Sequence, residues 1–395
     1  MLKPTSLATH QMAHRTKVWS GIAGTPLCGP SGFVPAPHEV LTARAADLLG
    51  LLGSPGLLVI DPPVVVPCDD RALVVGVLIH GDEHSGWIAA AELLRDLATG
   101  ICPLARRLII LIGNVFAAAY NRRFLDGQRD FNRIWKPGPS RPSQEESWAQ
   151  KVVDQIAALS PQGLFAVVDL HNNSGRNPCY ACVARLRPKD LDLARLFSPH
   201  IVHFEHPDTT LGAAMAQRAP SVTLEAGPSG CPEGLARLGH TLRTLLVLPD
   251  LSQTTTTAQP TTVFRNRFSL GVDPTWQITM TALSSIMSIT AAENDMLWLR
   301  EDIDILNFVE LTAPTPIGRT SPAAARNPLW IRAVVGQGSS APNPCIPAAP
   351  RLAYHVTPGG LIVLKPGWIP AMLSPKPEAI RADCLGYLME HLARE

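Results

Sequence analysis

Charged residues are scarce in this sequence, and neither sign of charge dominates. Only 17% of the 395 residues are Asp, Glu, Lys or Arg, and the formal net charge is +1. A basic face that could neutralise phosphate groups or lie on an anionic membrane surface is therefore not expected. Long apolar runs are missing as well, because no stretch approaches the ~20 consecutive residues that a bilayer span needs. We expect neither a nucleic-acid partner nor a membrane partner.

Cysteine is also scarce, and the 8 cysteines are mostly scattered singly along the chain. This distribution suits reduced thiols in a cytoplasmic protein better than a disulfide framework. Cys179 and Cys182 form a C-x-x-C pattern, but no second pair at zinc-finger spacing accompanies them, so we interpret both as structural cysteines. The first 20 residues lack the continuous apolar core of a secretory signal. We therefore expect a cytoplasmic location.

The most informative stretch is an apolar run that ends in a histidine. Residues 73–79 are small, β-branched or aliphatic and predict a buried strand; His80 follows, and Glu83 lies three residues later in a turn flanked by glycine. Residues 87–97 then have helical spacing. A histidine and a carboxylate at the carboxyl end of a strand can bind one zinc ion if a third ligand joins them. Because His-x-x-Glu is common by chance, other parts of the sequence must decide.

Two further apolar runs end in residues of the same chemical kind. Residues 164–170 lead to His171, which alone would more often be structural but, as a second strand-terminal histidine, is the natural third ligand. Asp169 lies on the same side of that strand and can orient a ligand imidazole. Residues 221–224 lead to Glu225, which is either a buried, paired carboxylate or the general base of a zinc hydrolase.

Two polar segments leave alternatives open. Residues 120–135 contain four arginines and form either a solvated loop or a wall that binds a carboxylate by paired hydrogen bonds; their position after the predicted strand at 108–115 favours the wall. His200, His203 and His206 form either a second metal site or a strand and turn near a substrate pocket, and we favour the second interpretation.

Four short motifs resemble one known family in order and approximate spacing. They are His80-Gly81-Asp82-Glu83, Asp130-Phe131-Asn132-Arg133, Asp169-Leu170-His171-Asn172 and Leu224-Glu225-Ala226-Gly227. The chain is similar over roughly residues 70–310 to the succinylglutamate desuccinylase and aspartoacylase family of zinc amide hydrolases. The resemblance implies an α/β fold of the carboxypeptidase A kind, in which helices flank a mixed, mostly parallel sheet and a smaller C-terminal domain is rich in β-structure.

The resemblance also implies roles for individual residues. One zinc ion per chain is expected, with His80, Glu83 and His171 as its ligands. Glu225 aligns with the family's general base, and Arg123 aligns with the arginine that polarises the scissile carbonyl.

Further positions concern the substrate. Asn132 and Arg133 align with the pair that binds the carboxylate of the substrate's amino-acid part. In aspartoacylases a second substrate arginine lies ten residues before the general base; this chain has Met215 there, and its nearest basic residue is Arg218.

The function that follows is zinc-dependent hydrolysis of the amide bond of an N-acyl amino acid or a similar small carboxylate-bearing amide. One alternative is a zinc carboxypeptidase that acts on peptide C-termini. The other is a catalytically silent zinc-containing binding protein, against which Glu225 and Arg123 argue, because a site that only binds needs neither. The expected partner is a small-molecule substrate, and a homo-oligomer is compatible with the sequence.

The expected domain order has four parts. Residues 1–66 form a lead-in packed on the catalytic domain, residues 67–251 form the zinc hydrolase domain, residues 252–262 form a linker or mobile loop, and residues 263–395 form the C-terminal β-rich domain.

Several local elements are predicted as well. Residues 39–52 and 143–159 have the pattern of amphipathic helices. Residues 57–60 with 64–66, and residues 359–367, are predicted as hairpins.

Overall fold

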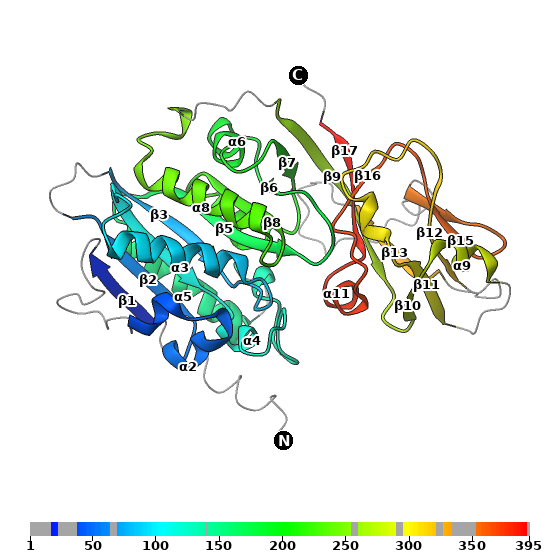
Figure 1. Cartoon of the computed structure of the whole chain (residues 1–395), viewed down its shortest axis with the longest axis horizontal. Helices are drawn as coiled ribbons and strands as arrows, with labels where there is room; N and C mark the ends of the chain where they lie inside the picture. Colours follow the sequence, from blue (N-terminus) through cyan, green and yellow to red (C-terminus); the bar gives the residue numbers. More distant parts are fainter. Residues whose placement is uncertain are drawn as a thin grey trace. The chain divides into compact units, whose positions relative to one another are not determined.

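The structure is a computed structural model of the whole chain (Figure 1). It describes residues 17–22, 38–63, 69–136, 138, 141–253, 260–289, 295–320, 327–333 and 353–392. Internal contacts divide the chain into two compact units. The first unit comprises Met1–Asn172, Cys179–Ile201 and Pro207–Thr261, and the second comprises Asn173–Pro178, Val202–His206 and Thr262–Glu395. The predicted domain limits near residues 66 and 252–262 stay predictions, since residues 64–68 and 254–259 lie outside the described residues.

The first unit is built on a mixed sheet. Its strands are β1 (Lys17–Ile22), β2 (Gly56–Asp61), β3 (Asp69–Val77), β4 (Arg106–Ile112), β5 (Leu164–Asn173), β6 (Tyr180–Val183) and β8 (Ser221–Pro228). They are ordered β1-β2-β4-β3-β5-β8-β6. The central strand β3 is parallel to both β4 and β5, while β2 runs antiparallel to β4 and β6 antiparallel to β8. The short strand β7 (His200–His203) follows β6 in sequence, and the division between the units falls within it.

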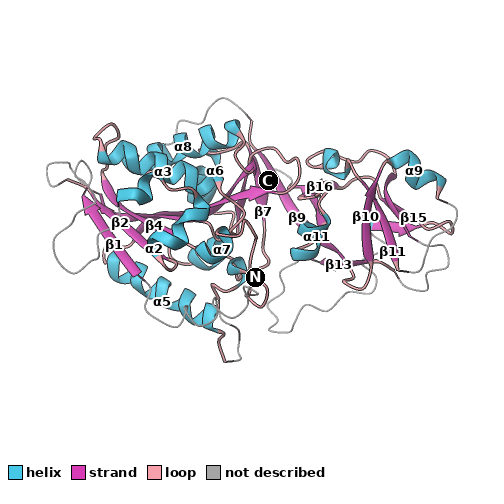
Figure 2. Cartoon of the chain, turned by 60° about the horizontal axis from the view of Figure 1, so that its bottom comes forward, coloured by secondary structure: helices cyan, strands magenta, loops and turns pink. Residues whose placement is uncertain are grey.

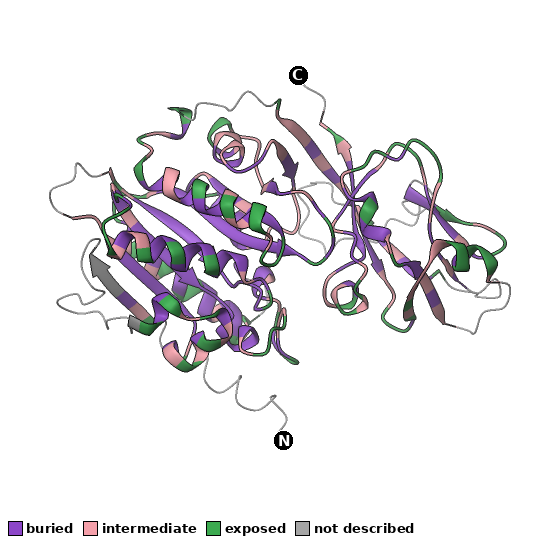
Figure 3. Ribbon diagram, viewed as in Figure 1, coloured by how far each residue is buried: buried purple, intermediate pink, exposed green. Residues whose placement is uncertain are grey.

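Helices cover both faces of this sheet (Figure 2). They are α2 (Leu48–Leu52), α3 (Ser85–Ala98), α4 (Val115–Ala118), α5 (Gln144–Leu159), α6 (Pro188–Arg195), α7 (Leu211–Met215) and α8 (Pro232–Val247). Helices α3 and α8 lie on one face and α5 lies on the other. Central parallel strands covered on both faces must be apolar along their whole length, which explains the continuous apolar runs in β3, β4 and β5. Figure 3 shows β3 and β5 buried over most of their length, and residues 108–112 of β4 are buried as well.

The second unit is rich in β-structure, as predicted. Strand β9 (Thr262–Val272) pairs antiparallel with β17 (Gly386–His391) and with β13 (Leu329–Ala333), and β16 (Ile369–Ala371) pairs with β17. A separate five-stranded sheet has the order β10 (Gln277–Thr281), β11 (Met296–Arg300), β12 (Thr315–Thr320), β15 (Leu361–Leu364) and β14 (Tyr354–Val356). Helices α9 (Leu283–Ser288) and α11 (Pro377–Ala382) complete the unit. The predicted α/β class with a smaller β-rich part is therefore confirmed.

The two predicted hairpins have different outcomes. Residues 359–367 contribute the end of a turn and the strand β15, but the partner arm is β14, which precedes the predicted segment. Strand β2 is present, yet it pairs with β1 and β4 in the sheet. The predicted second arm at residues 64–66 lies outside the described residues.

The helix predicted at 39–52 is broken into shorter pieces. Two 3₁₀ turns, His38–Thr42 and Ala45–Asp47, precede α2. The cause is tertiary: the indole Nε1 of Trp87 donates to the carbonyl of Ala43 (2.9 Å), and Nη1 of Arg95 donates to the carbonyl of Leu41 (2.6 Å). Both bonds stabilise the irregular backbone between the two 3₁₀ turns. The other predicted helix, α5, is present, and it begins with a capping box between Ser143 and Glu146.

Helix α8 begins in very close contact with the end of β8. A Cβ atom built on Gly234 would lie 1.9 Å from the carbonyl oxygen of Ala226, so no larger residue fits without a backbone shift. We expect Gly234→Ala to lower the free energy of unfolding by about 1–3 kcal/mol, as overpacking does. The matched control is Gly50→Ala in α2, where a Cβ meets nothing within 4 Å. That variant should be neutral or gain up to about 1 kcal/mol. Denaturant unfolding of both variants measures the difference, and equal stabilities would contradict the contact.

Candidate metal centre

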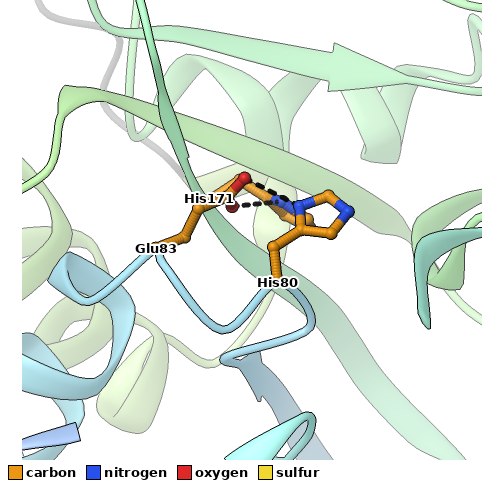
Figure 4. A group of neighbouring side chains, drawn as sticks. All are labelled: His80, Glu83 and His171. Atoms are coloured by element: carbon orange, nitrogen blue, oxygen red, sulfur yellow. Dashed lines mark hydrogen bonds and ion pairs between the residues drawn. The ribbon is translucent and has the colours of Figure 1, made fainter. Parts of the chain in front are cut away.

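Two neighbouring parallel strands bring the predicted ligands together (Figure 4). Strand β3 ends at Val77, and Leu78 takes a positive φ of 55°, which turns the chain toward His80 and Glu83. His171 lies near the end of β5, beside β3 in the sheet. Because both strands run in the same direction, their carboxyl ends reach the same edge of the sheet. The three side chains point toward one another there.

The carboxylate of Glu83 lies between the two imidazoles. Its Oε1 is 2.7 Å from Nδ1 of His80, and its Oε2 is 2.7 Å from Nδ1 of His171. The two rings are 4.9 Å apart between centroids and inclined by 71°. Ligand atoms from all three residues lie within 4.8 Å of one another, and all three side chains are buried. Within the described ranges, no other group of three or more such residues converges in this way.

The outer nitrogen of each imidazole faces a second carboxylate. Nε2 of His80 is 3.1 Å from Oδ1 of Asp130, and Nε2 of His171 is 2.9 Å from Oδ2 of Asp169. Ligating histidines in metal sites usually donate their second N–H to a carboxylate in this manner. With the proton on each Nε2, both Nδ1 lone pairs face the oxygens of Glu83. The nitrogen lone pairs and the carboxylate oxygens repel one another unless positive charge lies between them. A divalent cation can supply that charge. The residues present therefore fit a metal ion.

The carboxylates around the two imidazoles favour the protonated form of each ring. Burial alone would lower the pKa of both imidazoles, but the surrounding carboxylates outweigh it: the pKa of His80 is raised, and that of His171 is raised well above its ordinary value. Burial would raise the pKa of Glu83, yet His80 and His171 hold it below its ordinary value. A proton and a metal ion thus compete for the same place.

Asp130 connects the candidate metal-binding group, which consists of His80, Glu83 and His171, to the arginine-rich segment, residues 120–135. From the sequence, no role was assigned to Asp130. Its carboxylate accepts hydrogen bonds from Arg123 Nη2 (3.1 Å) and from the backbone N–H of Asn132 (2.7 Å), besides facing His80. Burial opposes the charged form, but Arg123 and His80 hold the pKa of Asp130 well below its ordinary value. Its position in the motif Asp130-Phe131-Asn132-Arg133, two residues before Asn132, was the feature of the sequence that could have indicated such a role.

The predicted carbonyl-polarising arginine lies beside the three ligands. Nη1 of Arg123 is 3.8 Å from Oε1 of Glu83, and its guanidinium is largely buried against Asp130. The structure thus places one cationic donor next to the metal-binding group. A guanidinium can donate hydrogen bonds to an oxygen that carries negative charge.

The predicted carboxylate-binding pair lies in a single 3₁₀ turn, Phe131–Arg133. Asn132 is buried, and its Oδ1 accepts a hydrogen bond from the backbone N–H of Leu211 at the start of α7 (3.3 Å). Nη1 of Arg133 donates to the backbone carbonyl of Asn132 (3.0 Å). Part of the arginine-rich segment is therefore folded inward, with Asn132 buried and Arg123 largely buried, whereas Arg122 and Arg129 are exposed.

Glu225 lies in β8, the strand beside β5, and is buried. Burial is the largest cause of its raised pKa of about 8; His171 works against the shift and Glu83 adds to it. Charges on the metal-binding residues thus act directly on this carboxyl. A carboxyl whose pKa is brought near neutrality by burial is suited to exchange protons at neutral pH.

The remaining predicted positions lie outside this group. Cys179 and Cys182 are free thiols, and burial raises the pKa of Cys182 well above its ordinary value. Met215 is buried in the core around α7, whereas Arg218 is exposed. His203 lies in β7 and is largely buried. None of these residues is among the converging ligands.

Comparison with known proteins identifies relatives of one segment of this chain. Residues 69–246 match the family model of the succinylglutamate desuccinylase/aspartoacylase catalytic domain. The chain is 35% identical over 105 residues to a succinylglutamate desuccinylase of Burkholderia cenocepacia, and 34% identical over 138 residues to one of Burkholderia orbicola. These alignments cover 27% and 34% of this chain but only 29% and 40% of the relatives.

The fold has solved counterparts. The structure resembles the crystal structure of a succinylglutamate desuccinylase/aspartoacylase from Rhodobacter sphaeroides with a TM-score of 0.52 and 17% sequence identity. The similarity covers 86% of this chain and 89% of that chain. At this level of identity the likeness concerns the fold alone.

Proposed function

Because residues 69–246 belong to the succinylglutamate desuccinylase/aspartoacylase family, we propose that this protein is a zinc-dependent deacylase that hydrolyses the amide bond of an N-acyl amino acid. The observation that carries the proposal is the convergence of two imidazole Nδ1 atoms on the carboxylate of Glu83, with both outer nitrogens facing carboxylates and Glu225 in the neighbouring strand. His80, Glu83 and His171 would bind one zinc ion per chain. Zinc would supply Lewis-acid polarisation and lower the pKa of water.

The chain's own residues supply the other functions. In its ionised form, which a bound cation would favour, Glu225 takes a proton from the attacking water and passes it to the leaving amine; burial makes this carboxylate a stronger base than an ordinary one. Arg123 donates hydrogen bonds to the oxygen on which negative charge develops. Asn132 and Arg133 bind the free carboxylate of the substrate and thereby position the scissile bond.

The cellular setting belongs to the same proposal. The cysteines that the structure describes are free thiols, which supports a reducing compartment such as the cytoplasm. None of the helices in the described residues is both long and apolar enough to cross a membrane. The proposed partner is a small N-acyl amino acid.

One purified sample can test the proposal. Its zinc content is measured first, and N-acetyl, N-succinyl and longer N-acyl amino acids are then screened beside short peptides. We expect about one zinc ion per chain and release of the free amino acid from at least one small amide. Activity on peptide C-termini alone would favour a carboxypeptidase. Full zinc content without any turnover would favour a binding protein.

Replacement of Arg123 should separate turnover from metal binding. We expect Arg123→Gln to lower kcat by a factor on the order of 10²–10³, as loss of an oxyanion donor does, while zinc content is unchanged. The matched control is Arg122→Gln, because Arg122 is exposed and pairs only at the surface with Asp126 (2.9 Å). Steady-state kinetics and metal analysis of both variants test this. Equal activities would remove the role assigned to Arg123.

A further inference from the structure

Asn172 follows the ligand His171 directly and is 5% exposed. Its side-chain Oδ1 accepts a hydrogen bond from the backbone N–H of Ser85, the first residue of α3 (3.0 Å). Its Nδ2 donates to the carbonyl oxygen of Gly227 near the end of β8 (2.9 Å). One buried amide therefore connects the segment after Glu83 with the segment after Glu225, and β5 lies between them.

The backbone of the same residue contacts the metal-binding group. The N–H of Asn172 donates to Oε2 of Glu83 (3.1 Å), the oxygen that faces His171. A substitution at Asn172 retains this backbone contact and removes only the side-chain contacts. Metal binding and the position of β8 can therefore be changed separately.

Several contacts in the described part of the chain hold the end of β8. Gly227 lies in β8 two residues beyond the proposed general base and has a positive φ of 73°, which favours glycine. On one side, Ala226 packs directly against Gly234 of α8. The N–H of Gly230 donates to Oγ of Ser85 (2.9 Å), so the turn after β8 and the start of α3 are bonded to each other. The Asn172 side chain bonds to both of these parts, to Ser85 at the start of α3 and to Gly227 near the end of β8.

We propose that Asn172 is a positioning residue that sets the place of Glu225 relative to the metal-binding group. It acts through Gly227, which lies two residues beyond Glu225 in the same strand. This inference rests on the proposed function for its kinetic consequence. Its structural consequence, a fixed contact between the start of α3 and the end of β8, does not depend on any activity.

Two substitutions divide the contacts of the side chain. Asn172→Ala removes both hydrogen bonds, whereas Asn172→Asp keeps an acceptor for Ser85 and lacks the donor to Gly227. We expect both variants to bind one zinc ion per chain and to lose kcat by roughly 10- to 100-fold, the range found when residues that orient a metal site are replaced. KM should change less than threefold, because the substrate carboxylate is bound elsewhere.

The matched control is Ser198→Ala. Ser198 is equally buried in the first unit, and its hydroxyl also joins two backbone groups, donating to the carbonyl of Cys179 (2.7 Å) and accepting from the N–H of His200 (3.0 Å). This variant should lose a comparable amount of thermal stability and keep kcat within threefold of wild type. A similar loss of kcat in Ser198→Ala would show that Asn172 matters only for stability and would overturn the proposal.

Hydrogen exchange supplies the reading that needs no turnover. In Asn172→Ala, but not in Ser198→Ala, the amides of Ser85 and Gly230 should exchange at least tenfold faster in both metal-free and zinc-loaded protein. Unchanged exchange at both amides would overturn the positioning role. If wild type hydrolyses no amide, the proposed function fails, while the exchange rates still decide whether Asn172 positions the end of β8.

Discussion

Glu225→Gln is expected to retain one zinc ion per chain and to lose turnover by a factor on the order of 10²–10⁴, the range that a general acid–base residue contributes. The physical reason is specific to this carboxyl. Burial raises the pKa of Glu225 to about 8, so the metal-free protein holds it protonated at neutral pH. Glutamine has the size and neutrality of that protonated form, and the fold should accept it without loss.

The pH dependence of stability provides a control for this variant. A carboxyl whose folded pKa exceeds its unfolded value stabilises the fold below the unfolded pKa, and this stabilisation decreases as pH rises through the folded value near 8. Metal-free wild type should therefore lose stability between about pH 5 and pH 9 relative to Glu225→Gln, which does not titrate. Denaturant unfolding across this range measures the difference. Turnover like that of wild type in Glu225→Gln would remove the assigned role.

His80→Ala should lose both the metal and the activity. Without His80, only two of the three proposed protein ligands remain, Glu83 and His171. Asp130 also loses the imidazole that it faces. After dialysis we expect less than about a tenth of the zinc content of wild type, since structural and catalytic zinc ions need at least three protein ligands. Added zinc should raise the melting temperature of wild type and leave that of the variant unchanged.

The matched control is His84→Ala. His84 lies in the same turn, but its Nε2 is 3.0 Å from the backbone carbonyl of Gly81, and it is not among the converging ligands. That variant should retain zinc. Full zinc content in His80→Ala, or equal loss in both variants, would contradict the assignment of ligands.

Acid should release the metal from wild-type protein. The raised pKa values of His80 and His171 mean that protons bind these imidazoles more readily than ordinary histidines when the cation is absent. Zinc affinity is therefore expected to decrease as pH falls, because each proton that binds displaces a ligand. Competition with a chelator at several pH values measures this slope.

The main features of the centre could be predicted from the sequence because they depend on local order. Apolar runs predicted β3, β5 and β8, and a polar residue at or near the end of each run predicted a shared edge. The rule that parallel strands place their carboxyl ends together then brought His80 and His171 into one group without any knowledge of distances. The cap of α5 was predictable for the same reason, since Ser143 and Glu146 lie three residues apart.

Other features required the tertiary structure, because they depend on groups that are far apart along the chain. Asp130 reaches His80 across 50 residues, and the indole of Trp87 takes a carbonyl from the helix predicted at 39–52. Which nitrogen of each imidazole faces Glu83, and whether one amide can connect Ser85 with Gly227, are also decided only when the strands are packed. The order of the sequence determined that His80, Glu83 and His171 gather at one edge of the sheet. The hydrogen bonds of these side chains depend on distances of a few ångströms. The packing of the strands therefore decided how the side chains are oriented and which charges surround them.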